Sequence, residues 1–239
     1  MERSHIENAI RTALEVCRHF QFALPPYACW SREEWMSAGP EWDEVRDCML
    51  GSDVTDFGSE RFEEIGRVLF TLRNGRSNDP KYLKPYAEKL LIDPENQRAP
   101  AHFHRSKRED IICRHGGNIL VQLSKATSEG GWSDERFVIS VNGCLRELAP
   151  KAIVRLSPGE SLTIPPGTIH QFWGEEGTGW PFEGKRYSLS SEISSVCDDW
   201  NDNVFFDDWA ARFPTIAEDV PANHFRCSEY PRTAEPLSH

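Results

Sequence analysis

The sequence has no excess of positive charge and no long apolar run. Its 239 residues include 27 lysines and arginines against 38 aspartates and glutamates, which gives a net charge of −11. This balance, together with the lack of basic runs, excludes nucleic acid as the main partner. No apolar segment approaches the roughly 18 residues that a membrane-spanning helix needs. We therefore expect no membrane partner.

Paired cysteines and nucleotide-binding fingerprints are also missing. The seven cysteines are widely spaced and none forms a C-x-x-C pair, so neither a disulfide framework nor a zinc ribbon is indicated. No glycine-rich dinucleotide or P-loop pattern occurs, which argues against a nucleotide cofactor. Residues 1–20 lack the apolar core of a secretory signal. These observations predict a cytoplasmic protein with reduced thiols.

The first part of the chain has helical patterning. Apolar residues recur at helical spacing between positions 6 and 20. Capping-box spacing occurs twice, at Ser4 with Glu7 and at Ser31 with Glu34. We predict a helical N-terminal layer over residues 1–66.

Short β-prone segments separated by turn residues follow from 67 to 195. Examples are 119–123, 137–141 and 153–156. Such spacing predicts a mainly β protein, an antiparallel barrel or sandwich. Residues 196–239 are acidic and aromatic, and we expect them to pack against the barrel as a flanking segment. Without an internal repeat or linker, residues 1–239 are predicted to form a single domain.

Histidines and one glutamate have the spacing of a metal site. His102 and His104 are two residues apart, so on a strand their side chains point to the same side. Glu109 follows shortly, and His170 lies on a later β-prone segment. Three imidazoles and one carboxylate suit a divalent first-row metal that keeps open positions for substrate. The chain is therefore a candidate metalloenzyme.

The residues around these ligands resemble the paired motifs of the cupin superfamily. The matching positions are His102-x-His104-x4-Glu109-x6-Gly116 and Gly159-x5-Pro165-x-Gly167-x2-His170. The resemblance implies a cupin-type antiparallel β-barrel or jelly roll with His102, His104, Glu109 and His170 as metal ligands. The alternative is a pair of core histidines that donate to backbone carbonyls.

Two features lie outside the cupin pattern. Gly174 stands where cupins often carry asparagine. Five further histidines have no place in either motif, and we expect them at the surface or behind the ligands: His5, His19, His115, His224 and His239.

Beyond the cupin motifs, nearly the whole chain resembles the bacterial D-lyxose isomerases, which are manganese-dependent cupins. The similar segments are 69–75, 86–89, 102–112, 156–161, 165–167, 192–199 and 202–203. This resemblance implies Mn²⁺ as cofactor, a monosaccharide substrate and a homodimer. Residues 178–185 are less similar to the family, which leaves the preferred sugar open.

Aldose–ketose isomerisation moves a proton between C1 and C2 of an open-chain sugar, so it needs an acid/base group beside the metal. We predict Glu192 as this base and Lys107 as the group that holds a substrate oxygen or delivers a proton. Lys89 and Asp202 are predicted to bind substrate hydroxyls, and Glu183 is a weaker candidate base. The alternative is that these residues form ordinary salt bridges or lie at the surface.

The predicted function is a metal-dependent conversion of D-lyxose to D-xylulose, and also of D-mannose to D-fructose. An iron cupin dioxygenase is the first alternative, because the same ligands hold Fe²⁺. A non-catalytic sugar-binding cupin is the second, and it would need neither Lys107 nor Glu192. The lysine within the histidine block favours the isomerase.

Overall fold

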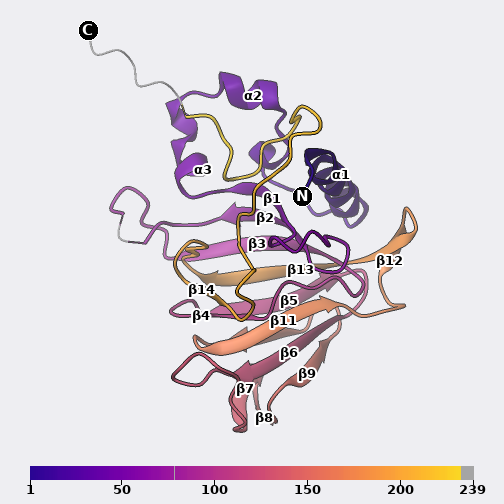
Figure 1. Cartoon of the computed structure of the whole chain (residues 1–239), viewed down its shortest axis with the longest axis vertical. Helices are drawn as coiled ribbons and strands as arrows, with labels where there is room; N and C mark the ends of the chain where they lie inside the picture. Colours follow the sequence, from indigo (N-terminus) through magenta and orange to yellow (C-terminus); the bar gives the residue numbers. More distant parts are fainter. Residues whose placement is uncertain (78, 233–239) are drawn as a thin grey trace.

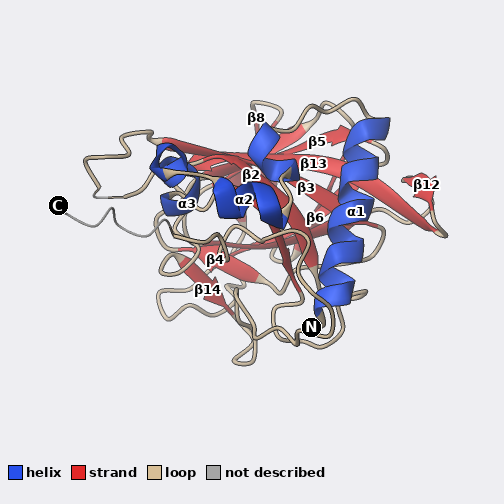
Figure 2. Cartoon of the chain, turned by 90° about the horizontal axis from the view of Figure 1, so that it is seen from above, coloured by secondary structure: helices blue, strands red, loops and turns tan. Residues whose placement is uncertain are grey.

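Two antiparallel β-sheets lie face to face in the computed structural model, and helices cover one of them (Figures 1 and 2). The structure describes residues 1–77 and 79–232. The α-helices are α1 (Arg3–His19), α2 (Arg32–Ser37) and α3 (Asp43–Asp47), with short 3-10 segments at Pro26–Cys29 and Pro40–Trp42.

Nine strands form the larger sheet and five form the smaller one. The larger sheet has the order β1 (Gly51–Thr55), β2 (Arg67–Arg73), β3 (Tyr86–Pro94), β13 (Lys185–Ser195), β5 (Glu109–His115), β10 (Ser161–Ile164), β7 (Phe137–Val141) and β8 (Cys144–Leu148), with β12 (Trp180–Phe182) paired to β13. The smaller sheet has the order β14 (Asn203–Phe205), β4 (His102–His104), β11 (Thr168–Gly174), β6 (Ile119–Lys125) and β9 (Ala152–Leu156).

Alternating side chains of the larger sheet supply two separate cores. In β2, Val68 and Phe70 pack with Ile6 and Ile10 of α1. Leu69, between them, packs instead with residues of the smaller sheet. This period of two is what a strand buried on both faces requires. The inner core therefore lies between the two sheets, and α1 closes the outer face.

The predicted mainly β, antiparallel architecture is confirmed. The prediction named a barrel or a jelly roll, and the structure has two sheets packed face to face. Among the described residues the strands form two sheets and not a closed barrel. The space between the sheets is filled by apolar side chains over most of its length. At one end polar side chains replace them, and this is where the candidate ligands lie.

The helical layer is shorter than predicted. Its last α-helix ends at Asp47, and β1 pairs with β2 inside the range predicted as helical. Gly51, the first residue of β1, has φ +106°, and a Cβ there would lie 2.0 Å from the Tyr230 hydroxyl oxygen. Close packing of the C-terminal segment thus requires glycine at this position.

One of the two predicted capping boxes forms. In α2, Ser31 N donates to Glu34 Oε2 at 2.7 Å and Glu34 N donates to Ser31 Oγ at 3.3 Å. At α1 the prediction is wrong, because the helix begins at Arg3 and Ser4 N donates to Asp219 Oδ1 at 3.0 Å. A contact from the distant C-terminal segment takes the place of the local cap.

The C-terminal segment packs against both the smaller sheet and the helices. Its strand β14 pairs with β4. Further along, Tyr230 stacks on Trp35 of α2 with ring centroids 3.8 Å apart. His239 lies outside the described residues. In the described part of the chain, no helix has the length and apolar character to cross a membrane.

Candidate metal centre and active site

Two strands of the smaller sheet bring the three predicted histidine ligands together. His102 and His104 lie on β4, and His170 lies on β11 directly opposite His102. One nitrogen from each imidazole lies within 4.8 Å of the others. With their ring protons on Nδ1, His102 donates to the Pro100 carbonyl and His170 to the Thr168 carbonyl, both at 2.9 Å. Their Nε2 lone pairs are then available to a metal.

Glu109 reaches the histidines from β5 of the opposite sheet. Its Oε1 lies 2.9 Å from His170 Nε2 and its Oε2 lies 3.4 Å from His104 Nε2. Oε1 is buried without a hydrogen-bond donor, as is His104 Nδ1. A buried carboxylate oxygen without a donor, facing imidazole nitrogens, is the environment that a bound cation would satisfy. The four residues therefore fit a divalent metal.

The protonation states suit metal binding. Burial lowers the pKa of His102 well below its usual value, and burial together with nearby Lys107 lowers the pKa of His104. Burial would raise the pKa of Glu109, but Lys107 and the neighbouring histidines hold that pKa well below its usual range. His102 and His104 are thus neutral imidazoles and Glu109 is an ionised carboxylate, the forms that bind metals.

Lys107 and Glu192 lie beside the four ligands. Lys107, in the loop that crosses from β4 to β5, is 3% exposed. Its Nζ lies 2.6 Å from Glu109 Oε2 and 2.8 Å from Glu192 Oε1 of β13. Burial opposes the charge on Glu192, but Lys107 and then Lys89 lower the pKa of the carboxyl. Glu192 is therefore a carboxylate able to accept a proton.

Lys89 contacts two residues that no sequence pattern connects with it. Its Nζ lies 3.2 Å from Asp199 Oδ1 and donates to Cys197 Sγ at 2.8 Å. Asp199 in turn pairs with Arg212 at 3.2 Å, and Arg212 pairs with Asp53 at 2.5 Å. Arg212 lines the cavity that contains the four candidate ligands, the metal cavity. It belongs to no sequence motif, so only the fold reveals it.

Asp202 and Glu183 have other surroundings. Asp202 accepts hydrogen bonds from Ser106 N at 2.8 Å, Ser106 Oγ at 2.6 Å and Lys107 N at 3.0 Å. The prediction that Asp202 binds substrate stays a prediction, since these bonds describe the protein alone. Glu183 is half-exposed and pairs with Arg11 of α1 at 2.7 Å. The structure therefore places Glu183 away from the ligands.

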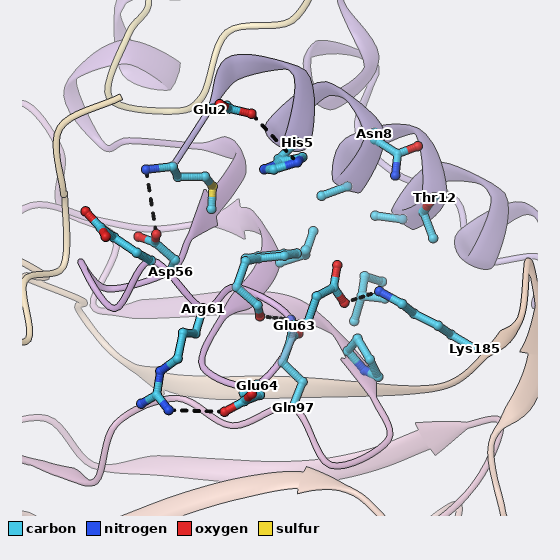
Figure 3. A pocket seen from close by; sticks show the side chains of 18 of the residues that line it. Glu2, His5, Asn8, Thr12, Asp56, Arg61, Glu63, Glu64, Gln97 and Lys185 are labelled. Atoms are coloured by element: carbon cyan, nitrogen blue, oxygen red, sulfur yellow. Dashed lines mark hydrogen bonds and ion pairs between the residues drawn. The ribbon is translucent and has the colours of Figure 1, made fainter. Parts of the chain in front are cut away.

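The remaining described histidines lie elsewhere. His19 stacks on Trp180 with centroids 3.9 Å apart, His115 stacks on Phe20, and His224 contacts Glu7. His5 borders a cavity of about 630 Å³ between α1 and residues 56–64 (Figure 3).

Despite its volume, that cavity lacks the residues predicted for metal binding and proton transfer. It contains none of the four candidate ligands, and its three cationic groups are each paired with a carboxylate. Figure 3 shows Lys185 paired with Glu63 and Arg61 with Glu64. The Met1 amino group pairs with Asp56. The metal cavity is only about 60 Å³, yet it gathers the ligands, Lys107, Glu192 and Lys89. The smaller cavity is therefore the candidate site, because of its reactive groups and not because of its volume.

Known proteins are similar to this chain over nearly its full length. A D-lyxose isomerase family profile matches residues 1–230. The D-lyxose/D-mannose isomerase of Serratia proteamaculans is 40% identical over 233 residues, which cover 97% of this chain and 99% of the relative. The protein of the same name from Escherichia coli O157:H7 is also 40% identical, over 96% and 98% of the two chains.

Solved structures of the same fold are sugar isomerases with little sequence identity. The L-ribose isomerase of Cellulomonas parahominis without ligand is 15% identical, with a TM-score of 0.58 over 91% of this chain and 98% of that one. The L-ribose isomerase of Acinetobacter sp. DL28 in complex with L-ribose is 14% identical, with a TM-score of 0.59 over 88% and 94%. These likenesses establish the cupin fold. The family profile and the two 40% identical relatives show that this chain belongs to the D-lyxose isomerase family.

Proposed function

We propose that the protein interconverts D-lyxose and D-xylulose, and D-mannose and D-fructose, by moving a proton between C1 and C2. The observation that carries this proposal is the contact of Lys107 with Glu192, 2.8 Å apart and buried beside the candidate ligands. A binding protein has no need of a buried acid/base pair at that place. The names of the two 40% identical relatives supply the sugars.

Glu192 and Lys107 divide the proton transfers between carbon and oxygen. The Glu192 carboxylate takes the proton from C2 of the aldose and returns it to C1, which converts the aldehyde carbon into a CH₂OH carbon. Lys107 donates a proton to the O1 oxygen as its charge develops and takes one back from the C2 hydroxyl, so that C2 becomes the ketone. A divalent metal held by His102, His104, Glu109 and His170 would stabilise negative charge on the sugar oxygens.

Further parts of the proposal concern the metal, the assembly and the compartment. We propose Mn²⁺, because three imidazoles and one carboxylate suit a first-row divalent ion and the family resemblance points to manganese. We also propose a homodimer that binds a monosaccharide through Lys89 and Asp202. All seven cysteines lie in the described chain as free thiols, which supports a reducing, cytoplasmic location.

Metal replacement and a sugar panel test the proposed reaction. The protein is stripped with a chelator, reloaded with Mn²⁺ and supplied with free aldoses in D₂O. We expect ketose formation from D-lyxose and D-mannose, with deuterium entering the product carbon. Ketose from none of the sugars would contradict the isomerase, and oxygen consumption would indicate the dioxygenase.

The variant Glu192→Gln tests the assigned base. It keeps the shape of the side chain but cannot accept the C2 proton, so we expect full manganese content and a loss of kcat of at least about 10²-fold. Metal content is measured by elemental analysis and kcat by ketose formation. The matched control is Glu147→Gln, an exposed glutamate of β8 that pairs with Arg136 outside the site. Unchanged activity in Glu192→Gln removes this residue as the base.

A further inference from the structure

A third cavity lies directly beside the metal cavity. It measures about 440 Å³, and its lining includes Thr71, Arg76 and Trp200. Two residues, Lys89 and Asp199, line both cavities. Their ion pair, 3.2 Å between Nζ and Oδ1, therefore separates the two cavities. The metal cavity, on one side, is the inner cavity, and the cavity of about 440 Å³, on the other side, is the outer cavity.

The inner cavity alone is too small for the proposed substrate. Its 60 Å³ holds a few water molecules, at about 15–30 Å³ each. An open-chain pentose or hexose has about ten or more heavy atoms and needs several times that room. Part of the sugar must therefore extend out of the inner cavity, and the outer cavity is its immediate neighbour.

Three polar side chains of the larger sheet lead from the inner cavity to the outer one. Glu192 of β13 lies opposite Lys89 of β3, and Lys89 lies opposite Thr71 of β2. Residues directly opposite on antiparallel strands point to the same face, so these three side chains form a row. At about 4.8 Å per strand, the row spans roughly 9.6 Å from Glu192 to Thr71. An extended hexose, with about five C–C bonds of about 1.5 Å, fits along it.

We infer that the outer cavity is the binding site for the tail of the sugar. C1 and C2 lie in the inner cavity, the middle hydroxyls take the place of the Lys89–Asp199 contact, and the last carbon of a hexose extends to Thr71 and Arg76. Thr71 and Arg76 then determine how well a six-carbon sugar binds relative to a five-carbon one. This inference rests on the proposed function and adds to it the residues that set the preferred chain length.

Variants of the outer cavity test the inference. Thr71→Val removes one hydroxyl without changing the size of the side chain. Arg76→Ala removes a half-exposed guanidinium whose loss does not disturb the core. We expect each to raise the ratio of KM for D-mannose to KM for D-lyxose about 3- to 10-fold, which is the loss of one hydrogen bond. The matched control is Thr163→Val, in β10 of the same sheet and absent from the linings of both cavities, for which we expect an unchanged ratio.

A binding measurement separates this inference from the proposed function. Trp200 lines the outer cavity and is 65% exposed, so a sugar tail bound there changes its fluorescence. D-mannose is titrated into the manganese-loaded protein and into Trp200→Phe, and the difference is the Trp200 signal. Ketose formation with unchanged KM ratios in both variants overturns the inference and leaves the isomerase intact. A wild type that forms no ketose contradicts the proposed function, and a missing Trp200 signal then overturns the inference as well.

Discussion

The ammonium group of Lys107 lies between two buried carboxylates. Burial lowers its pKa, but Glu109 and Glu192 outweigh that effect and raise the pKa well above its usual value. Without a metal, Lys107 is the main cation facing Glu109, at 2.6 Å. With a metal bound, Glu109 gains a second positive partner. The importance of Lys107 for stability should therefore depend on metal loading.

Substitution of Lys107 by methionine should destabilise the metal-free protein most. Removal of one partner from a buried charge pair costs about 3–5 kcal/mol, because the other charge stays buried and unpaired. We expect the free energy of unfolding to fall by this amount in the presence of chelator and by clearly less with Mn²⁺ bound. Chemical denaturation under both conditions measures the difference.

A surface lysine provides the control for this substitution. Lys125 at the end of β6 pairs with Glu135 at 3.2 Å and is half-exposed. Lys125→Met should cost at most about 1 kcal/mol, with or without metal. Equal losses for Lys107→Met in chelator and in Mn²⁺ would show that the metal does not share the Glu109 charge.

Residue spacing predicted the four ligands, but no sequence pattern predicted the ion pairs around Lys89. The histidines and Glu109 follow from short local patterns, and the structure brings all four together. The contact of Lys89 with Asp199 joins residues 110 positions apart. No local pattern encodes it, because it depends on how the chain folds back after β13. Arg212 was missed for the same reason.

At the scale of elements, the loop from β4 to β5 connects the two halves of the site. It carries Lys107 from the sheet with the histidines to the sheet with Glu109. Asp202 holds the loop by accepting two backbone hydrogen bonds and one from the Ser106 hydroxyl. The segment before β14 thus orders the loop between the ligands.

Removal of the Asp202 carboxylate should weaken metal binding. In Asp202→Ala the loop loses three hydrogen bonds, and we expect manganese affinity to fall about 10- to 100-fold, as for other groups that support metal ligands. Asp202→Asn keeps one acceptor oxygen, so its manganese affinity should lie between those of Asp202→Ala and the wild type. Titration calorimetry with Mn²⁺ measures the affinities. The exposed Asp208→Ala is the control, and equal affinities in all four proteins would exclude this role.

Strand β1 shows why the N-terminal boundary was predicted incorrectly. Its sequence, Gly51-Ser-Asp-Val-Thr, has a single large apolar side chain, yet all five residues are buried. Asp53 is balanced by Arg212, and Ser52 and Thr55 donate to backbone carbonyls of the C-terminal segment. A polar strand whose partners are distant residues has no hydrophobic alternation that could identify it.

At the scale of the molecule, Arg3 joins the first helix to the last described segment. It is 3% exposed and donates to both Glu229 oxygens, at 2.7 and 3.0 Å, and to Glu218 at 2.7 and 2.9 Å. Burial tends to raise the pKa of Glu229, but Arg3 and Arg226 lower it below its usual value. The ionised form of Glu229 is therefore the one that stabilises the fold.

Glu229→Gln should destabilise the protein near neutral pH and not in acid. A pKa lowered by folding stabilises the protein above the unfolded pKa of about 4.3, and this stabilisation disappears as the pH falls through the folded value. We expect a loss of about 1.5–3 kcal/mol at pH 7 that shrinks below about pH 4. Denaturation curves across this range test it, with the exposed Glu64→Gln as control. A constant difference at all pH values would contradict the assigned charge.

Strand β4 has only three residues, two of them candidate ligands, and it is held by β11 on one side and by β14 on the other. So short a strand has little stability of its own. A nascent chain that has emerged as far as residue 195 already contains all four ligands but lacks β14. In such a chain β4 can pair with β11 alone, because residues 203–205 supply its second neighbour. Synthesis therefore completes the surroundings of the histidines only after it has supplied all four candidate ligands.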